Sequence, residues 1–273
     1  LGNQNNDVAV YRPIFHEDTL IGFSAVKGHQ ADIGGNVRGG YNPNAKEVWQ
    51  EALRIPPIKV YEKGKLKKDV WDLIFANIRL DIVAHDMRAQ MGACKVGERR
   101  LMALIEKYGM ESYQAHKVAL FEASRKMVEA EIGQIPNGVY SGEGMVYFDG
   151  HNEGTEFTIR VKITVEDSKI IFDYSGTDDQ TNGFVNGTFT SSASATILVF
   201  LQLINPDIPH NEGMVKPIEM IIPEGTILNA RYPKATTFGN HLCPPNADAI
   251  IRALAPVIPD RVTAGWNNLL CCL

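Results

Sequence analysis

Apolar and polar residues alternate along the first thirty positions, and this pattern predicts a β-hairpin. Asp7 to Phe15 and Leu20 to Val26 are rich in β-favouring residues, and His16 to Thr19 between them is typical of a turn. A glycine-rich stretch over residues 34–40 follows, in which the backbone can turn sharply. The hairpin therefore leads directly into a loop that a ligand could approach closely.

Helical spacing replaces this alternation further along the chain. Ala45 to Leu53 has the period of a short helix, and Ile58 to Tyr61 is typical of a strand. Asp69 can cap a long helix, because apolar residues recur behind it at intervals of three and four: Val70, Leu73, Ile74, Ile78 and Ile82. A second helix ends at Gly109, and Ser112 can cap a third.

The second half of the chain returns to alternation. Three segments, residues 138–147, 156–165 and 169–174, predict a β-meander with one face on the core. Further segments predict a buried helix, a strand and a last helix over residues 191–203, 217–223 and 246–254. We expect an α+β fold with mixed and antiparallel sheets. Its expected divisions are a β-rich segment (1–68), a helical insert (69–133) and an α+β segment (134–273).

Composition narrows the class of protein. The 273 residues are 44% hydrophobic and 22% charged, with a net charge of −5, which is ordinary for a globular protein. The acidic balance argues against a nucleic-acid partner, and the one basic run, Lys63 to Lys68, is short and interrupted by Gly64 and Leu66. The longest apolar run, Ala195 to Ile204, is too short to span a bilayer, so we expect no membrane segment. Cys94, Cys243, Cys271 and Cys272 show no disulfide framework, which favours a cytoplasmic location. Both ends of the sequence resemble segments from the middle of a fold, so we expect this chain to be part of a longer subunit.

The most informative candidate site is the segment that joins the hairpin to the glycines. His29 and Asp32 are three residues apart, and Asp7 opens the strand that returns to the same place. One imidazole and two carboxylates suit a divalent ion such as Zn²⁺ or Mn²⁺. The alternative is that His29 hydrogen-bonds Asp32 and only locks the loop.

Other polar residues are open to two interpretations. Arg79 and Arg88 could bind an anionic substrate or form salt bridges on helices. Asn240 and His241 precede a helix, where they could face a substrate anion or cap the loop. Asp178 and Asp179 could bind a second cation or could be solvated residues of a turn.

Several blocks, in order, resemble one family. They are Asp7–Val10, Gly28–Gly35, Gln50–Pro57, Asn77–Arg79, Asp86–Gln90, Asp173–Thr177, Asn205–Pro209 and Ile222–Thr226. Together they resemble the hydantoinase B/5-oxoprolinase family, which includes subunits of acetone and acetophenone carboxylases. The resemblance spans nearly the whole chain.

The resemblance implies a subunit of a hetero-oligomeric enzyme. Its hydantoinase A-like partner would bind ATP, in keeping with the lack of a GxxxxGK[ST] loop in these 273 residues. ATP would activate a small carbonyl substrate, for ring opening by water in one branch of the family or carboxylation from bicarbonate in the other. The resemblance also implies a divalent metal ion, with Asp7, His29 and Asp32 as the matching residues.

The sequence departs from the family at a few positions. Gln4 stands where a histidine is common, three residues before Asp7, and could contact substrate instead. Gln30 and Asp81 also differ from the usual residues. These departures favour an acetophenone-carboxylase-like ketone carboxylase over a hydantoinase or 5-oxoprolinase that hydrolyses a cyclic amide. A non-catalytic scaffold with a decayed site is the third hypothesis.

Overall fold

The computed structural model describes residues 4–149, 151–152 and 154–265. The chain forms two compact units, one of residues 4–42 and 48–115 and the other of residues 43–47 and 116–265 within the described part. The fold is α+β, with antiparallel and mixed sheets, as the sequence predicts. Cys271 and Cys272 lie outside the described residues.

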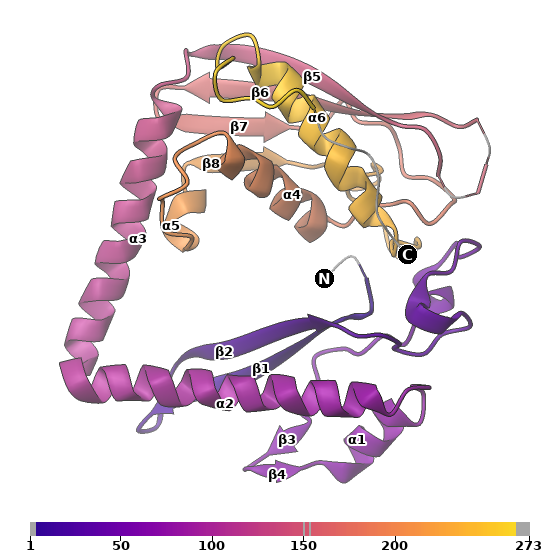
Figure 1. Ribbon diagram of the computed structural model, residues 1–273, viewed down its shortest axis with the longest axis vertical. Coiled ribbons are helices and arrows are strands. Elements are labelled where there is room, and N and C mark those ends of the chain that lie inside the picture. The colour runs from indigo at the N-terminus through magenta and orange to yellow at the C-terminus, as the bar shows by residue number, and fades with distance from the viewer. Residues whose placement is uncertain (1–3, 150, 153, 266–273) are drawn as a thin grey trace. The chain divides into compact units, whose positions relative to one another are not determined.

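The first unit is built on a long antiparallel hairpin. Strands β1 (Asp7–His16) and β2 (Thr19–His29) confirm the predicted hairpin, and helix α2 (Ile82–Tyr108) runs along it (Figure 1). The remaining elements are η1 (Arg38–Gly40), η2 (Val48–Gln50), the small hairpin of β3 (Tyr61–Glu62) and β4 (Lys65–Leu66), and α1 (Lys68–Phe75).

Helix α2 covers one face of the hairpin through both apolar and polar contacts. The side chain of Gln90 donates to the Val8 carbonyl at 3.2 Å, and the Cys94 thiol lies 3.6 Å from the Val10 carbonyl. Arg12 pairs with Glu98 at 2.5 Å. Because side chains alternate across a strand, the opposite face of the hairpin turns away from α2.

Two helical predictions need correction. Of the helix expected over Ala45–Leu53, the structure forms only the single turn η2. The long helix expected from Asp69 is broken, because α1 ends at Phe75 and α2 begins at Ile82. The intervening segment leaves the helical path where Arg79 reaches Asp32, 47 residues earlier in the chain, a long-range contact that apolar spacing does not reveal.

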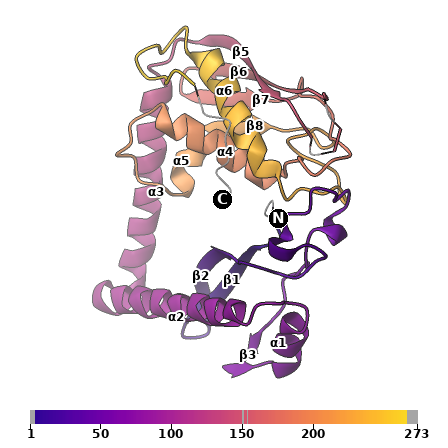
Figure 2. The ribbon, with the colours of Figure 1, turned by 45° about the vertical axis from the view of Figure 1, so that its right-hand side comes forward.

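The second unit is a four-stranded sheet covered by helices. Strands β5 (Gly138–Val146), β6 (Phe157–Glu166) and β7 (Lys169–Asp173) form the predicted meander, and β8 (Ile218–Ile221) joins β7 in parallel. Helices α4 (Phe189–Gln202) and α6 (Cys243–Leu254) lie over one face, as Figure 2 shows. The short α5 (Glu212–Val215) and η3 (Gly239–Leu242) complete the unit.

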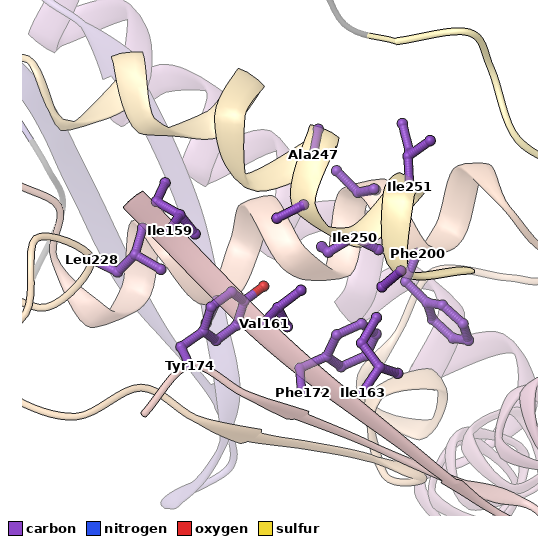
Figure 3. Packing of buried hydrophobic residues seen from close by; sticks show 14 of the residues in the cluster. Ile159, Val161, Ile163, Phe172, Tyr174, Phe200, Leu228, Ala247, Ile250 and Ile251 are labelled. Carbon is purple, nitrogen blue, oxygen red and sulfur yellow. The ribbon is translucent and has the colours of Figure 1, made fainter. Parts of the chain in front are cut away.

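The core of this unit lies between the sheet and its helices. Ile159, Val161 and Ile163 on β6 are buried and point toward α4 and α6, with Phe172 and Tyr174 beside them (Figure 3). Tyr174 shares a hydrogen bond of 2.7 Å with Thr196 on α4, which provides its buried hydroxyl with a partner.

The helical insert does not form a unit of its own. Helices α1 and α2 belong with the β1–β2 hairpin, and the boundary between the two units falls between Ala115 and His116, inside α3 (Met110–Ile132). The three expected segments follow the order of secondary structure along the chain, whereas the contacts divide it in two.

Candidate functional site

The register of the hairpin brings Asp7 and His29 together. The two residues are directly paired across β1 and β2, and the Nδ1 of His29 lies 3.0 Å from Oδ1 of Asp7. Directly opposed residues of a strand pair point to the same side, so both stand on the face turned away from α2. The partner of the His29 ring is therefore Asp7, and the expected bond to Asp32 is not the one formed.

A lysine completes this group. The Nζ of Lys27 lies 2.8 Å from Oδ2 of Asp7, so the two carboxylate oxygens face different partners. The Asp7 side chain is mostly covered, with 18% of it exposed, while those of Lys27 and His29 are about half exposed. Water screens such a pair, so its contribution to stability is small; its significance lies in the charge that it places beside His29.

Gln4 and Tyr41 border the same pair. The Gln4 carbonyl accepts the backbone N–H of Asp7 at 3.1 Å, and the Tyr41 hydroxyl lies 3.5 Å from Oε1 of Gln4. The ring centroids of Tyr41 and His29 are 6.3 Å apart. The backbone of Gln4 thus contacts Asp7, its amide oxygen lies near the Tyr41 hydroxyl, and the expected contact of Gln4 with a substrate stays a prediction.

Asp32 is held in a different way. Its carboxylate is buried and accepts the N–H groups of Gly34 at 2.9 Å and Gly39 at 3.1 Å. Arg79 donates Nη1 to Oδ2 at 3.0 Å and also donates to the Gly35 carbonyl. Burial raises the pKa of the Asp32 carboxyl, but the hydrogen bonds from Gly34, Gly39 and Arg79 outweigh it, so its pKa lies below the ordinary value. Asp32 locks the glycine-rich loop.

The predicted three-residue set is therefore assembled only in part. Asp7 and His29 converge, whereas the oxygens of Asp32 are engaged by the loop and by Arg79. Within residues 4–149, 151–152 and 154–265, no group of three or more His, Cys, Asp or Glu side chains is arranged to hold a metal ion. Metal binding itself stays a prediction.

The Asp7–His29 pair has the spacing of two neighbouring metal ligands. Zinc–nitrogen and zinc–oxygen bonds of about 2.0–2.2 Å at a tetrahedral angle place neighbouring donor atoms roughly 3.3 Å apart. The 3.0 Å between Nδ1 of His29 and Oδ1 of Asp7 is close to that spacing. The same 3.0 Å is the length of the hydrogen bond that the two side chains form, so an ion between them would replace this bond and would need its other donors from elsewhere.

Two further candidate residues lie in the second unit. Asn240 and His241 are on η3, directly before α6. Oδ1 of Asn240 and Nε2 of His241 are buried without a hydrogen-bond partner. Burial lowers the pKa of His241, and its ring lies 4.7 Å from that of Phe238 between centroids.

Three of the acidic and basic candidates, whose roles the sequence leaves open, have partners in the structure. Arg79 binds Asp32, and the guanidinium of Arg88 lies 5.0 Å from the centre of the Trp71 ring. Asp178 pairs with Arg160 at 2.6 Å. Lys27 and Tyr41 were missed altogether, although period-two alternation from His29 places Lys27 on the same face.

Comparisons with known proteins agree with the resemblance. The family model described as hydantoinase B/oxoprolinase matches residues 1–273. The chain is 33% identical over 275 residues to the caprolactamase subunit beta of Pseudomonas jessenii, covering 98% of this chain and 46% of that subunit. It thus spans about half the length of this relative.

Solved structures share the fold. The crystal structure of ATP-dependent caprolactamase from Pseudomonas jessenii matches with a TM-score of 0.89 and 32% identity, over 95% of this chain and 45% of that one. Nucleotide-free acetone carboxylase matches with a TM-score of 0.89 over 98% of this chain and 38% of that one. At 21% identity the second likeness concerns the fold alone. No helix in the described part of the chain is both long and apolar enough to cross a membrane.

Proposed function

Because this chain belongs to the hydantoinase B/oxoprolinase family, we propose that it forms part of the B-type subunit of an ATP-dependent enzyme that opens a cyclic amide with water. The caprolactamase subunit supports this proposal, since it is more than 30% identical over nearly the whole chain. A hydantoinase A-like subunit would bind ATP, which fits the lack of a phosphate-binding GxxxxGK[ST] loop in these residues. We place the hetero-oligomer in the cytoplasm.

One observation carries the proposal for the site. Asp7 and His29, 3.0 Å apart on one face of the hairpin, present an oxygen and a nitrogen donor to a divalent ion of the Zn²⁺ or Mn²⁺ type. A bound ion would polarise the substrate carbonyl or activate water. Gln4 and Tyr41 border the pair and can orient a polar group of the substrate.

Lys27 adds a positive charge to this site. Activation by ATP makes the substrate oxygen a phosphate ester, which is anionic, and the Lys27 ammonium lies 2.8 Å from Asp7 on the exposed face. Such a charge stabilises a negatively charged intermediate there. Asp32 and Arg79 act indirectly, because they hold the loop that follows His29.

A ketone carboxylase is the second candidate. The feature that favours it is Gln4, which stands next to Asp7 where the resemblance leads us to expect a histidine. The two reactions differ in their substrates, because carboxylation requires bicarbonate and amide hydrolysis does not. An assay of ADP release with a lactam or a ketone, each with and without bicarbonate, separates them.

Metal analysis of the purified complex tests the site. We expect a stoichiometric divalent ion that is lost, together with turnover, in His29→Ala. His16→Ala is the matched control, since His16 lies on the same hairpin at its far end, paired with Thr19. If His29→Ala assembles and retains full turnover, and the parent complex carries no ion, the chain is a scaffold and the proposal is wrong.

A further inference from the structure

The face of the β1–β2 hairpin that is turned away from α2 is apolar along most of its length. Tyr11 and Phe23, from the two strands, are 67% and 60% exposed. The register pairs Tyr11 with Ala25, and Pro13 with Phe23. We define the outer face by these and the neighbouring exposed residues: Ala9, Tyr11, Pro13, Phe15, Leu20, Phe23 and Ala25.

Leaving this face in water is costly. Burial of large apolar side chains stabilises a protein, and four such side chains are exposed here together: Tyr11, Phe15, Leu20 and Phe23. Scattered exposed hydrophobics are ordinary, whereas a contiguous group marks an interaction surface. In the described residues the sheet contains only β1 and β2, so the outer edges of both strands are also open to pairing.

The size of the outer face indicates what covers it. Strands of about ten residues extend about 33 Å, and two strands are roughly 10 Å wide, so the face offers on the order of 300 Å². A stable interface between subunits buries about 800 Å² on each partner. The face is therefore too small for a subunit interface of its own and matches a single strand or helix laid along it.

The matching relatives are longer than this chain, and their additional length could supply such an element. The chain covers 46% of the caprolactamase subunit beta and 45% of the caprolactamase chain of known structure. More than half of each relative's length therefore lies outside the matched region. We propose that the outer face is covered by a strand or helix of the same subunit that lies outside residues 1–273.

This covering element would also border the Asp7–His29 pair. Asp7, Lys27 and His29 continue the outer face at the end of the hairpin away from its turn, because they follow the same alternation. The covering segment thus limits the access of water to these side chains. The proposal depends on the exposed face and on the greater length of the relatives, and its test does not require a metal ion or turnover.

Site-specific photo-crosslinking in the full-length subunit, assembled with its partner, tests the proposal. Tyr11 and Phe23 are replaced one at a time by benzoylphenylalanine, which preserves an aromatic side chain, and the crosslinked peptides are identified by mass spectrometry. We expect both positions to crosslink to one segment of the same subunit outside residues 1–273. Tyr61, which is exposed on the separate β3–β4 hairpin, is the control and should not crosslink to that segment.

Every other outcome overturns the proposal. A crosslink to residues 116–265 would show that the second unit covers the face, and a crosslink to the ATP-binding subunit would show that the partner does. A crosslink between a labelled and an unlabelled B-type subunit, mixed before assembly, would show that a second copy covers the face. If neither position crosslinks to that segment, the proposal is also wrong, and accessibility of both positions to hydroxyl radicals would show that the outer face is open. Unchanged assembly of the variants, checked by size-exclusion chromatography, shows that each reports on the native fold.

Discussion

The guanidinium of Arg79 binds the carboxylate of Asp32 across 47 residues of chain. Nη1 lies 3.0 Å from Oδ2, and the Asp32 side chain is almost wholly buried, whereas that of Arg79 is 37% exposed. A buried carboxylate needs both charge compensation and hydrogen bonds. Arg79 and the glycine-rich loop provide them together, so this ion pair fixes the segment directly after His29.

Removing Arg79 should destabilise the first unit. We expect Arg79→Met to reduce the free energy of unfolding by about 3 kcal/mol, the lower end of the range for breaking a buried pair, because Arg79 is partly in water. Denaturant titration measures this loss. The double variant Arg79→Met/Asp32→Asn should lose less than the sum of the single variants, since it leaves no unpaired buried charge. Strict additivity would contradict the pairing.

The same carboxylate should make stability depend on acid. The pKa of Asp32 is lowered in the folded state, so the unfolded chain binds more protons as the pH falls below about 3.9. Its contribution is therefore complete above that pH and is lost as the pH falls through the folded pKa.

The free energy of unfolding, measured from pH 7 to pH 2.5, tests this sign. We expect the acid slope to be shallower in Asp32→Asn than in the parent. Asp149 and Asp173 also have lowered pKa values, because hydrogen bonds outweigh the effect of their burial, so some slope should remain. An identical slope in the variant would show that Asp32 does not titrate in this way.

Local patterns predicted the elements of this fold better than its long-range contacts. The β1–β2 hairpin and the β5–β7 meander follow from alternation over ten residues, which the backbone imposes directly. The break between α1 and α2 was not predicted in this way, and in the broken segment Arg79 binds Asp32 in a distant loop, a contact that no local pattern encodes.

The candidate site shows the same division. Pairing of the hairpin ends brings Asp7 to His29, as strand order suggests. The spacing of His29 and Asp32 suggested shared ligation, but three residues beyond a strand end the backbone has turned, and Asp32 faces the loop amides and Arg79. The residue types indicated which side chains carry candidate ligand atoms. Only the path of the backbone shows which of these side chains lie close together.

Close packing of α6 on β5 depends on a glycine. A Cβ on Gly144 would meet the backbone of Pro245, at the start of α6. We expect Gly144→Ala to reduce the free energy of unfolding by about 1–3 kcal/mol, because the backbone of Pro245 cannot move aside as a flexible side chain can. Gly92→Ala on α2 is the control, since its Cβ would meet nothing within 4 Å. The free energy of unfolding of Gly92→Ala should rise by about 0.5–1 kcal/mol, because alanine favours a helix more than glycine does. Thermal unfolding of the two variants measures the contrast.

Lys27 should weaken metal binding at the Asp7–His29 pair. Its ammonium holds Oδ2 of Asp7 at 2.8 Å, so a divalent ion beside Oδ1 meets both a repelling charge and a carboxylate that is already paired. We expect Lys27→Met to tighten binding of Zn²⁺ or Mn²⁺ about tenfold, which corresponds to roughly 1.4 kcal/mol of repulsion between nearby exposed charges. Isothermal titration of the metal-depleted complex measures the affinity.

Lys59→Met is the matched control, because Lys59 also pairs with one carboxylate, that of Glu62, on an exposed surface away from the site. It should leave the affinity unchanged. Equal affinities in the parent and Lys27→Met would show that Lys27 does not compete with the ion for Asp7, and weaker binding in Lys27→Met would show that Lys27 instead holds Asp7 in its binding position.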